Sequence, residues 1–367
     1  MGPDRAGPSA EHEETMIHPR DCVTRLLNRA VADRVFPGAV WAVGNARNLL
    51  DVGTCGLADP TDPTATMRAS TIFDLASLTK IVAVWAVIGS LWEEQVLPLD
   101  EPLAAFWPDV ATHPVGRVTS RHLLAHTAGL PLRANLRPSY GTDPGAIRTG
   151  ILHAALRRPP GQAVEYTDRA ALILGYLTEH LTDTPLDRLA RSRIWLPLGM
   201  THTRFGPLPA PLAQRCAPTE YDPGTAAHLK GSAHDYSARA LGGVCGSAGV
   251  FSVVSDLARF QQYLLAPAAS PIGFGESWVA ESLRIQTGNL SPSRGLFWHL
   301  VPDTGSRKDI YVHHGFTGTS MWLSPSQERW AVLLTNKIYF TRSSESMIAI
   351  RKAYRRLVFG SPTRSLA

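Results

Sequence analysis

The sequence lacks the short patterns that mark several large classes of enzymes and metal proteins. Its four cysteines (Cys22, Cys55, Cys216 and Cys245) form no C-x-x-C pair, so no zinc or redox site is predicted. Four scattered cysteines in 367 residues also do not resemble a disulfide framework. A G-x-S-x-G elbow, an H-E-x-x-H helix and a P-loop are absent as well. We therefore expect neither a metal nor a cofactor.

Long apolar runs are also missing. The first sixteen residues are polar and acidic and contain no apolar core of a signal peptide. The longest apolar stretch, residues 81–92, is broken by Gly89 and Ser90 and is too short to cross a bilayer. These observations predict a cytoplasmic protein with reduced cysteines and no membrane partner.

Clustered positive charge is absent too, although the net charge is +5. The basic residues are almost all Arg and are spread along the chain, with no run longer than a pair such as Arg355-Arg356. Nucleic-acid binding favours a basic stripe with interleaved aromatic residues. We expect no nucleic-acid partner.

Hydrophobic periodicity predicts an α+β fold. Apolar, turn-bounded runs predict about five strands, at 39–43, 48–52, 310–314, 319–323 and 330–336. Helical spacing predicts a first helix ending at Pro37-Gly38, a last helix ending at Gly360, and central helices at 78–93, 120–126, 169–181, 186–196 and 255–265. Ser255 is expected to cap the last of these central helices. The segments 131–150 and 207–224 are rich in Pro and Gly and are predicted to be loops.

Strands at both ends with helices between them suggest one antiparallel sheet built from both termini and flanked by the terminal helices. We expect a flexible tail at 1–17, a sheet region at 18–76 and 245–367, and a mostly helical region at 77–244. The active site is expected at the junction of these two regions.

The strongest chemical pattern is Ser77-Leu78-Thr79-Lys80. A Ser and a Lys three residues apart on a helix share one face, so the lysine is placed to help remove the hydroxyl proton. The pattern is short, and a lysine that merely extends from a helix end to solvent would also produce it. Lys80 opens an apolar helix, and lysines are rarely buried unless they are paired, which favours a functional role. This context does not decide between the two interpretations, so other motifs are needed.

Six segments, in order along the chain, supply that context. They are DLASLTK at 74–80, LLAHTAGLP at 123–131, Pro160-Gly161 followed by Tyr166-Thr167-Asp168, LPLGM at 196–200, GGVCGSAGVF at 242–251 and HHGFTGT at 313–319. With them the chain resembles the serine β-lactamase and penicillin-binding-protein family, in particular class C β-lactamases and their esterase and acyltransferase relatives. The resemblance covers roughly residues 39–336.

The resemblance implies a role for each matching residue. Ser77 would be the nucleophile, Lys80 would share its proton, and Tyr166 would act as general base or acid. The backbone amides of Ser77 and Phe316 would form the oxyanion hole. His313 and Gly315, in the family's third motif, would line the substrate cleft from a strand.

One position departs from the family pattern. The family's Tyr-x-Asn is Tyr-x-Asp here, with Asp168 in the Asn position, which the resemblance implies faces the substrate cleft. An ionised Asp accepts hydrogen bonds only and favours a charged lysine nearby, which points to Tyr166 rather than Lys80 as the base. Counting Lys80, Asp168 and a neutral His313, the cleft charge is about zero, so we expect neutral esters or thioesters to be preferred over β-lactams.

Other residues allow a structural interpretation. His126 is expected to make a structural hydrogen bond, and His234-Asp235 to lie in a structural stretch before Gly242. His313 and His314 are adjacent on a strand and point to opposite faces, so they are not expected to share a metal.

Three functions remain open. The first is a cytosolic esterase or acyltransferase, and the second is an amide hydrolase, meaning a β-lactamase, DD-peptidase or D-aminopeptidase. The third is a catalytically inactive binding scaffold. The partner would be a small acyl ester, thioester or amide, and the sequence gives no oligomeric state.

Overall fold

The two ends of the chain supply one antiparallel sheet. The computed structural model describes residues 19–132, 136–267, 273–302 and 309–360. Its main sheet has six strands in the order β2-β1-β11-β10-β9-β8. These are β1 (Gly38–Gly44), β2 (Leu49–Gly56), β8 (His299–Leu300), β9 (Tyr311–His314), β10 (Ser320–Ser324) and β11 (Arg329–Thr335). The predicted antiparallel sheet is confirmed, and the two-residue β8 is an edge strand that the sequence analysis did not predict.

The pairing of β1 with β11 joins the strands from the start of the chain to those from its end. Val40 lies opposite Leu334, and both side chains enter the larger hydrophobic core on the side of the central helices. The next pair along, Trp41 and Leu333, faces the other way, into a smaller core. The strict alternation of a strand thus divides one apolar run between two cores.

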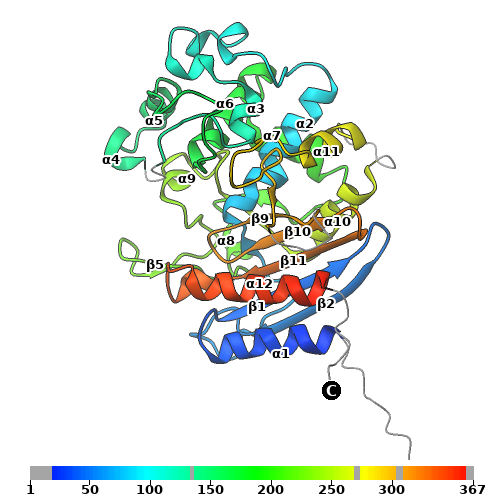
Figure 1. Ribbon diagram of the computed structural model, residues 1–367. Coiled ribbons are helices and arrows are strands. Elements are labelled where there is room, and N and C mark those ends of the chain that lie inside the picture. The colour runs from blue at the N-terminus through cyan, green and yellow to red at the C-terminus, as the bar shows by residue number, and fades with distance from the viewer. Residues whose placement is uncertain (1–18, 133–135, 268–272, 303–308, 361–367) are drawn as a thin grey trace, which may run out of the picture.

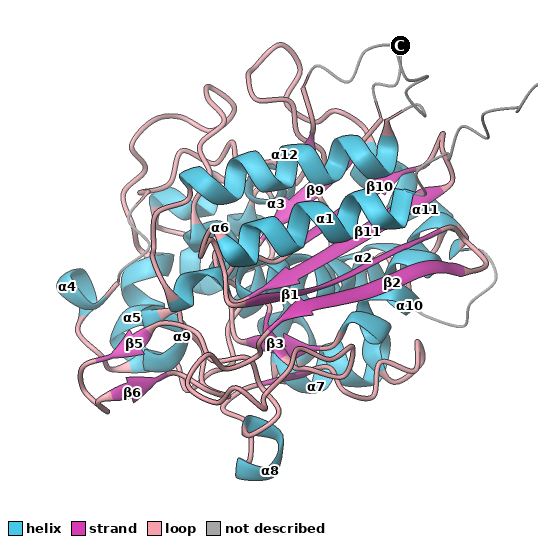
Figure 2. Ribbon diagram, turned by 90° about the horizontal axis from the view of Figure 1, so that it is seen from below, coloured by secondary structure: helices cyan, strands magenta, loops and turns pink. Residues whose placement is uncertain are grey.

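The smaller core lies between the sheet and the two terminal helices. Helices α1 (Pro19–Ala32) and α12 (Glu345–Phe359) lie side by side on one face of the sheet (Figures 1 and 2). Leu27 of α1 and Tyr354 of α12 are fully buried there. Helix α12 ends at Gly360 as predicted, but this glycine has φ −68° and does not form a left-handed cap. The predicted tail at 1–17 lies outside the described residues.

On the other side of the sheet lie the helices of the middle of the chain, of which α10 (Val254–Leu265) packs directly against β1 and β11 (Figure 1). These are α2 (Ala86–Glu93), α3 (Ser120–Leu124), α4 (Arg137–Tyr140), α5 (Pro144–Leu152), α6 (Asp168–Thr182), α7 (Leu186–Ala190), α8 (Ala210–Ala213), α9 (Tyr236–Ala240), α10 (Val254–Leu265) and α11 (Glu276–Leu283). Single turns and tighter or wider helical segments are η1 (Ala76–Leu78), η2 (Lys80–Trp85), η3 (Leu103–Ala105), η4 (Pro108–Val110), η5 (Pro114–Arg117), η6 (Arg191–Trp195) and η8 (Lys337–Tyr339). Two small sheets consist of β3 (Phe73–Asp74), β7 (Val250–Ser252) and β4 (Arg204–Phe205), and of β5 (Tyr221–Asp222) and β6 (Ala227–His228).

Two helical details differ from the sequence prediction. The predicted loop 131–150 contains α4 and the start of α5, whose first turn is capped by the side chain of Asp143 and opens with Pro144. Asp before Pro is a helix-start signal that the Pro- and Gly-rich composition obscured. Helix α10 begins after Val253 with no side-chain cap, so Ser255 lies inside its first turn and is not the cap.

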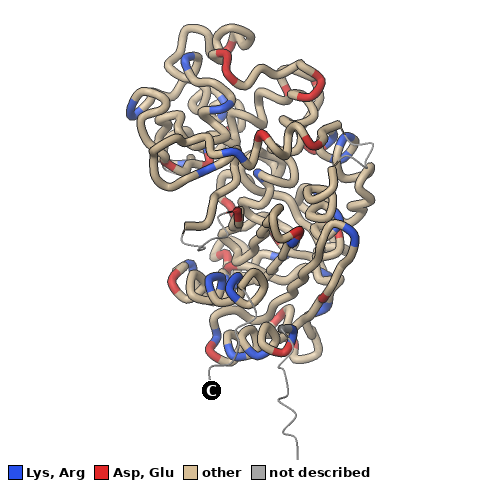
Figure 3. The backbone as a smooth tube through the Cα atoms, turned by 45° about the vertical axis from the view of Figure 1, so that its right-hand side comes forward, with Lys and Arg blue, Asp and Glu red and all other residues tan. Residues whose placement is uncertain are grey.

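A continuous helical segment at 76–93 runs through the larger core. By length and composition this segment is able to span a membrane, whereas the sequence analysis considered only residues 81–92 and judged them too short. However, 83% of the segment is buried inside the protein. Trp85 is at its centre and packs against Trp278 of α11 and Trp298. Basic and acidic residues are mixed over both halves of the molecule (Figure 3).

Candidate active site

Ser77 lies at the start of the buried core helix, on the tight turn η1. The residue before it, Ala76, has φ +49°, a left-handed conformation that costs energy for a residue with a Cβ atom. The side chain of Asp74 accepts a hydrogen bond of 2.8 Å from the Ala76 amide and holds this turn in place. The turn presents the Ser77 side chain to a cavity of ≈ 300 Å³ between the helical region and β9.

Lys80 lies next to Ser77 and is completely buried. Its Nζ atom donates three hydrogen bonds, to Ser77 Oγ at 2.9 Å, to Asp168 Oδ1 at 2.7 Å and to the Ser247 carbonyl at 2.8 Å. Burial lowers the pKa of Lys80, but the Asp168 carboxylate and the nearby Tyr166 side chain outweigh it and raise the pKa above the ordinary lysine value. The side chain is therefore an ammonium with all three N–H groups used.

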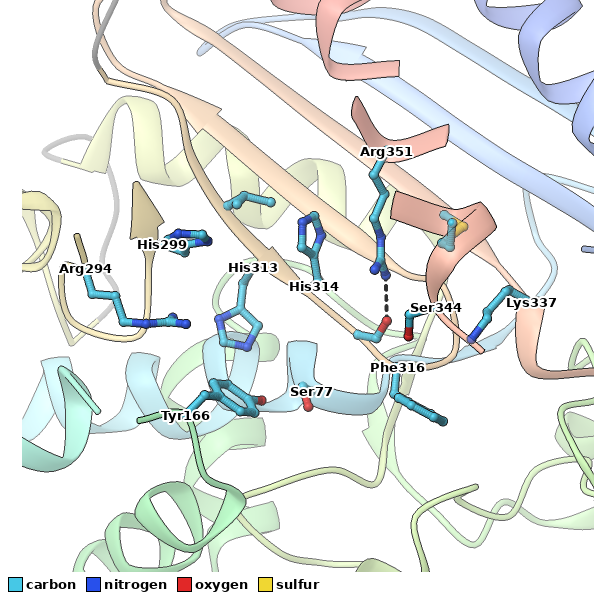
Figure 4. Close-up of a pocket in the computed structure, with 13 residues that line it drawn as sticks. Ser77, Tyr166, Arg294, His299, His313, His314, Phe316, Lys337, Ser344 and Arg351 are labelled. Carbon is cyan, nitrogen blue, oxygen red and sulfur yellow. Dashed lines mark hydrogen bonds between the residues drawn. The ribbon is translucent and has the colours of Figure 1, made fainter. Parts of the chain in front are cut away.

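Tyr166 and Asp168 are positioned by the start of helix α6. Thr167 is the N-cap residue: its hydroxyl accepts from the Arg169 amide and donates to the Pro131 carbonyl. The cap places Tyr166 on one side and Asp168 on the first turn, facing Lys80. Lys80 Nζ lies 5.3 Å from the centre of the Tyr166 ring, and the Tyr166 hydroxyl points toward Ser77 (Figure 4).

The opposite wall is formed by β9 and the loop that follows it. His313 is buried, and its Nδ1 is 2.7 Å from the Phe297 carbonyl, so Nδ1 carries the proton. Burial, reinforced by the charge of Lys80, lowers the pKa of His313 to about 3, so the ring is neutral at pH 7, as the sequence predicted. Its other nitrogen, Nε2, is buried without a hydrogen-bond partner among the described residues.

Gly315 allows this loop to approach the nucleophile turn. A Cβ atom at this position would lie 2.0 Å from Thr319 Oγ1 and 2.5 Å from the Leu75 carbonyl, which no side chain tolerates. The Thr317 and Thr319 hydroxyls donate to the carbonyls of Asp74 and Leu75. In the described part of the chain no acceptor is assigned to the Phe316 amide, which follows this glycine.

The structure brings together all the residues predicted for the site. Ser77, Tyr166, His313, Gly315 and Phe316 line the cavity, and Lys80 lies directly behind Ser77. Asp168 was expected to face the substrate, but it is not among the residues that line the cavity, because its carboxylate is bonded to Lys80. Among the described residues there is no cluster of three or more His, Cys, Asp or Glu that could hold a metal. Burial raises the pKa of the Cys245 thiol to about 11, which leaves it an unreactive thiol at pH 7.

Of the histidines given a structural interpretation, His126 departs from it and His234 does not. His126 was expected to make a structural hydrogen bond, but neither of its ring nitrogens has a partner among the described groups. Its ring packs instead against Tyr166, at 4.6 Å between ring centres. His234 pairs with Asp74 at 3.0 Å, whereas its sequence neighbour Asp235 caps helix α9. The ring of His234 stacks on Phe316.

The sequence analysis missed three cations that line the cavity: Arg294, Lys337 and Arg351. Arg294 lies over the Tyr166 ring at 5.7 Å, and its Nε has no hydrogen-bond partner among the described residues. Burial lowers the pKa of Lys337 to about 8. No short motif marks these residues, because each reaches the cleft from a different loop or helix. The cleft is therefore more positive than the three motif positions suggested.

Comparison with known proteins identifies this arrangement. The family model described as Beta-lactamase matches residues 23–354. The chain belongs to the β-lactamase family. Among curated members, a protein named putative D-alanyl-D-alanine carboxypeptidase from Escherichia coli (strain K12) is 30% identical over 304 residues, which are 73% of this chain and 69% of that protein.

Solved structures show the same β-lactamase fold. The hydrolase EstCE1, described as having promiscuous acyltransferase activity, aligns with a TM-score of 0.74 at 20% identity over 93% of this chain and 98% of its own. Simvastatin synthase (LovD) from Aspergillus terreus aligns with a TM-score of 0.75 at 19% identity over 94% of this chain and 98% of its own. The chain is a serine hydrolase of the β-lactamase-related family.

Proposed function

We propose that the protein is an esterase or acyltransferase that works through a covalent ester on Ser77. The Ser77 oxygen attacks the substrate carbonyl carbon, and the electron pair of the carbonyl bond moves to its oxygen. When this intermediate collapses, the bond to the leaving alcohol or thiol breaks and that group takes up a proton. Water or another alcohol or amine then attacks the acyl-Ser77 carbonyl and releases the acyl group.

The observation that carries this proposal is the hydrogen bonding of Lys80. Its three N–H groups all donate, and one of them donates to Ser77 Oγ. An ammonium in this position has no lone pair for the Ser77 proton, but it stabilises negative charge on the attacking oxygen. Tyr166, whose hydroxyl points toward Ser77, is then the residue that relays this proton: its oxygen accepts the Ser77 proton while its own O–H proton passes to the leaving group (Figure 4).

The amides of Ser77 and Phe316 would stabilise the tetrahedral intermediate. Both residues line the cavity, and no acceptor among the described residues is assigned to either amide. Loss of one such donor typically costs ~3–4 kcal/mol of transition-state stabilisation.

A second candidate function, cleavage of a peptide or amide that carries a carboxylate, is favoured by Arg294. This guanidinium lines the cavity beside Tyr166 and forms no ion pair with a described Asp or Glu. A cation in a cleft whose Lys80 charge is already balanced by Asp168 attracts a substrate anion. The curated relatives named putative D-alanyl-D-alanine carboxypeptidase fit this candidate. The preference for neutral substrates was derived from three positions only and left out this charge.

Covalent labelling and a substrate panel test both candidates. A fluorophosphonate is expected to add one phosphonyl mass to the peptide that contains Ser77, and Ser77→Ala should abolish the label. A label on Ser247 or Cys245 would contradict the assignment, and no label at all would favour an inactive scaffold. Comparing kcat/KM for p-nitrophenyl esters, D-alanyl-D-alanine peptides and nitrocefin then separates the esterase from the amide hydrolase. A cytoplasmic location stays a prediction.

A further inference from the structure

The guanidinium of Arg351, on helix α12, contacts the loop that follows β9. Arg351 donates to the Gly315 carbonyl at 2.7 Å, to the Thr319 carbonyl at 2.9 Å and to Ser320 Oγ at 2.9 Å. Figure 4 shows this side chain descending from α12 to the loop next to Ser77. A residue far along the chain is thus attached to the edge of the active site.

The partners of Arg351 are unusual for a partly buried cation. All three acceptors are neutral oxygens, and no described carboxylate forms an ion pair with this guanidinium. Burial alone lowers the pKa of Arg351, to about 10, so the side chain is still charged at pH 7. Even a partly buried charge carries a desolvation cost, and without a counterion this cost is offset only by the hydrogen bonds to these neutral oxygens.

The Gly315 carbonyl belongs to the same peptide group as the Phe316 amide. A peptide group is planar, so a hydrogen bond that fixes the carbonyl oxygen also fixes the direction of the N–H at the other end. A charged donor on that oxygen withdraws electron density from the group and makes the N–H a stronger donor. Arg351 therefore acts on one of the two amides proposed for the oxyanion hole without contacting it.

The rest of the loop is held in the same way. The Thr319 carbonyl accepts from Arg351, from the Gly315 amide at 2.8 Å and from Ser320 Oγ at 2.6 Å. His314 Nδ1 lies 2.9 Å from Ser320 Oγ. Since the Ser320 proton is directed to Thr319, His314 must be the donor in that contact. The loop is thus clamped between α12 and the turn that carries Ser77.

We propose that Arg351 is a positioning residue that orients and polarises the Phe316 amide as an oxyanion donor. The proposal rests on the proposed acyl-transfer function and names a residue of that site outside its sequence motifs. Because Arg351 also lines the cavity, direct binding of a substrate anion is the competing role. A neutral substrate separates the two roles, because only oxyanion stabilisation affects its turnover.

The test compares Arg351→Met, Arg351→Lys and, as a matched control, Lys352→Met, which removes an exposed cation from the next position of the same helix. A neutral p-nitrophenyl ester supplies kcat and KM, and a phenylboronic acid supplies the affinity for a tetrahedral anion on Ser77. Removing a whole oxyanion donor costs ~10²–10³ in kcat, so we expect Arg351→Met to lose about 10- to 100-fold. KM should change little, boronate affinity should fall by a similar factor, and Arg351→Lys should be intermediate.

Each outcome has a defined meaning. Unchanged kcat and boronate affinity in Arg351→Met, or a rise in KM alone, would overturn the inference. If Arg351→Met does not fold, Arg351→Lys carries the test, and full kcat in that variant also overturns it. An equal loss in Lys352→Met would show a general effect of charge on α12 and contradict the specific role. Wild-type protein that neither hydrolyses esters nor takes up a fluorophosphonate on Ser77 contradicts the proposed function itself.

Discussion

Replacing Asp168 by Asn removes the counterion of a fully buried lysine. Lys80 Nζ lies 2.7 Å from Asp168 Oδ1, and the two side chains are 0% and 21% exposed. The amide oxygen of the Asp168→Asn variant is still able to accept a hydrogen bond from Lys80, so the substitution changes the charge more than the geometry. It therefore tests whether this carboxylate keeps Lys80 an ammonium.

The expected loss of stability follows from this geometry. Breaking a buried ion pair by removing one partner typically costs ~3–5 kcal/mol. The retained hydrogen bond and the partial exposure of Asp168 reduce this cost, so we expect the free energy of unfolding to fall by ~2 kcal/mol at neutral pH. The control Asp33→Asn breaks an exposed pair with Arg29 and should change stability by less than ~0.5 kcal/mol.

The pKa of Lys80 also fixes the direction in which this difference in unfolding free energy changes with pH. In the wild type the pKa of Lys80 is raised in the fold, so its contribution is fully present below the ordinary lysine pKa and is lost as pH rises through the folded pKa. Without the carboxylate, burial lowers the pKa. The stability gap between wild type and Asp168→Asn should therefore be widest at neutral pH and narrow as the pH rises past the pKa of Lys80 in the variant.

Urea unfolding followed by tryptophan fluorescence, at neutral pH and at about pH 9.5, measures this gap. The pH dependence of kcat/KM for a neutral ester gives a second readout. A lysine that becomes neutral is able to accept the Ser77 proton, so the variant should gain a limb that rises with pH and that the wild type lacks. Equal stabilities at neutral pH, or a gap that widens with pH, would refute the reasoning.

Three further predictions concern the cleft. Tyr166→Phe should lower kcat by ~10²–10⁴ without a change in the unfolding midpoint, because Tyr166 is 40% exposed; a kcat within tenfold of wild type would remove Tyr166 from proton transfer. Arg294→Met should lower the ratio of kcat/KM for carboxylate-bearing peptides to kcat/KM for neutral esters by more than tenfold. The control Arg47→Met, which removes an exposed cation, should leave this ratio unchanged. An unchanged ratio in Arg294→Met would exclude Arg294 as the residue that binds the substrate carboxylate. Dialysis against EDTA should leave ester hydrolysis intact, and a loss restored by zinc would contradict the metal-free interpretation.

The amino-acid sequence was enough to establish the family, the nature of the sheet and the motif residues of the site. Strands such as β1 and β11 carry continuous apolar runs bounded by turns, and this pattern is local in the chain. The Ser77–Lys80 spacing fixes a shared helix face for the same reason. The effect of Asp168 on the charge of Lys80 was also predictable from the sequence, because the family pattern places these two residues side by side.

The set of charges that share the cleft became visible only in the folded molecule. Arg294 precedes a short edge strand, Lys337 follows β11 and Arg351 lies on α12, so their meeting near Ser77 depends on how the sheet packs against the helices. The partner of His234 was likewise decided by packing: Asp74 reaches it through space, whereas the adjacent Asp235 turns away to cap α9. Electrostatic interactions and hydrogen bonds act over a few ångströms whatever the separation along the chain, so a single sequence cannot reveal them until the fold has brought the groups together.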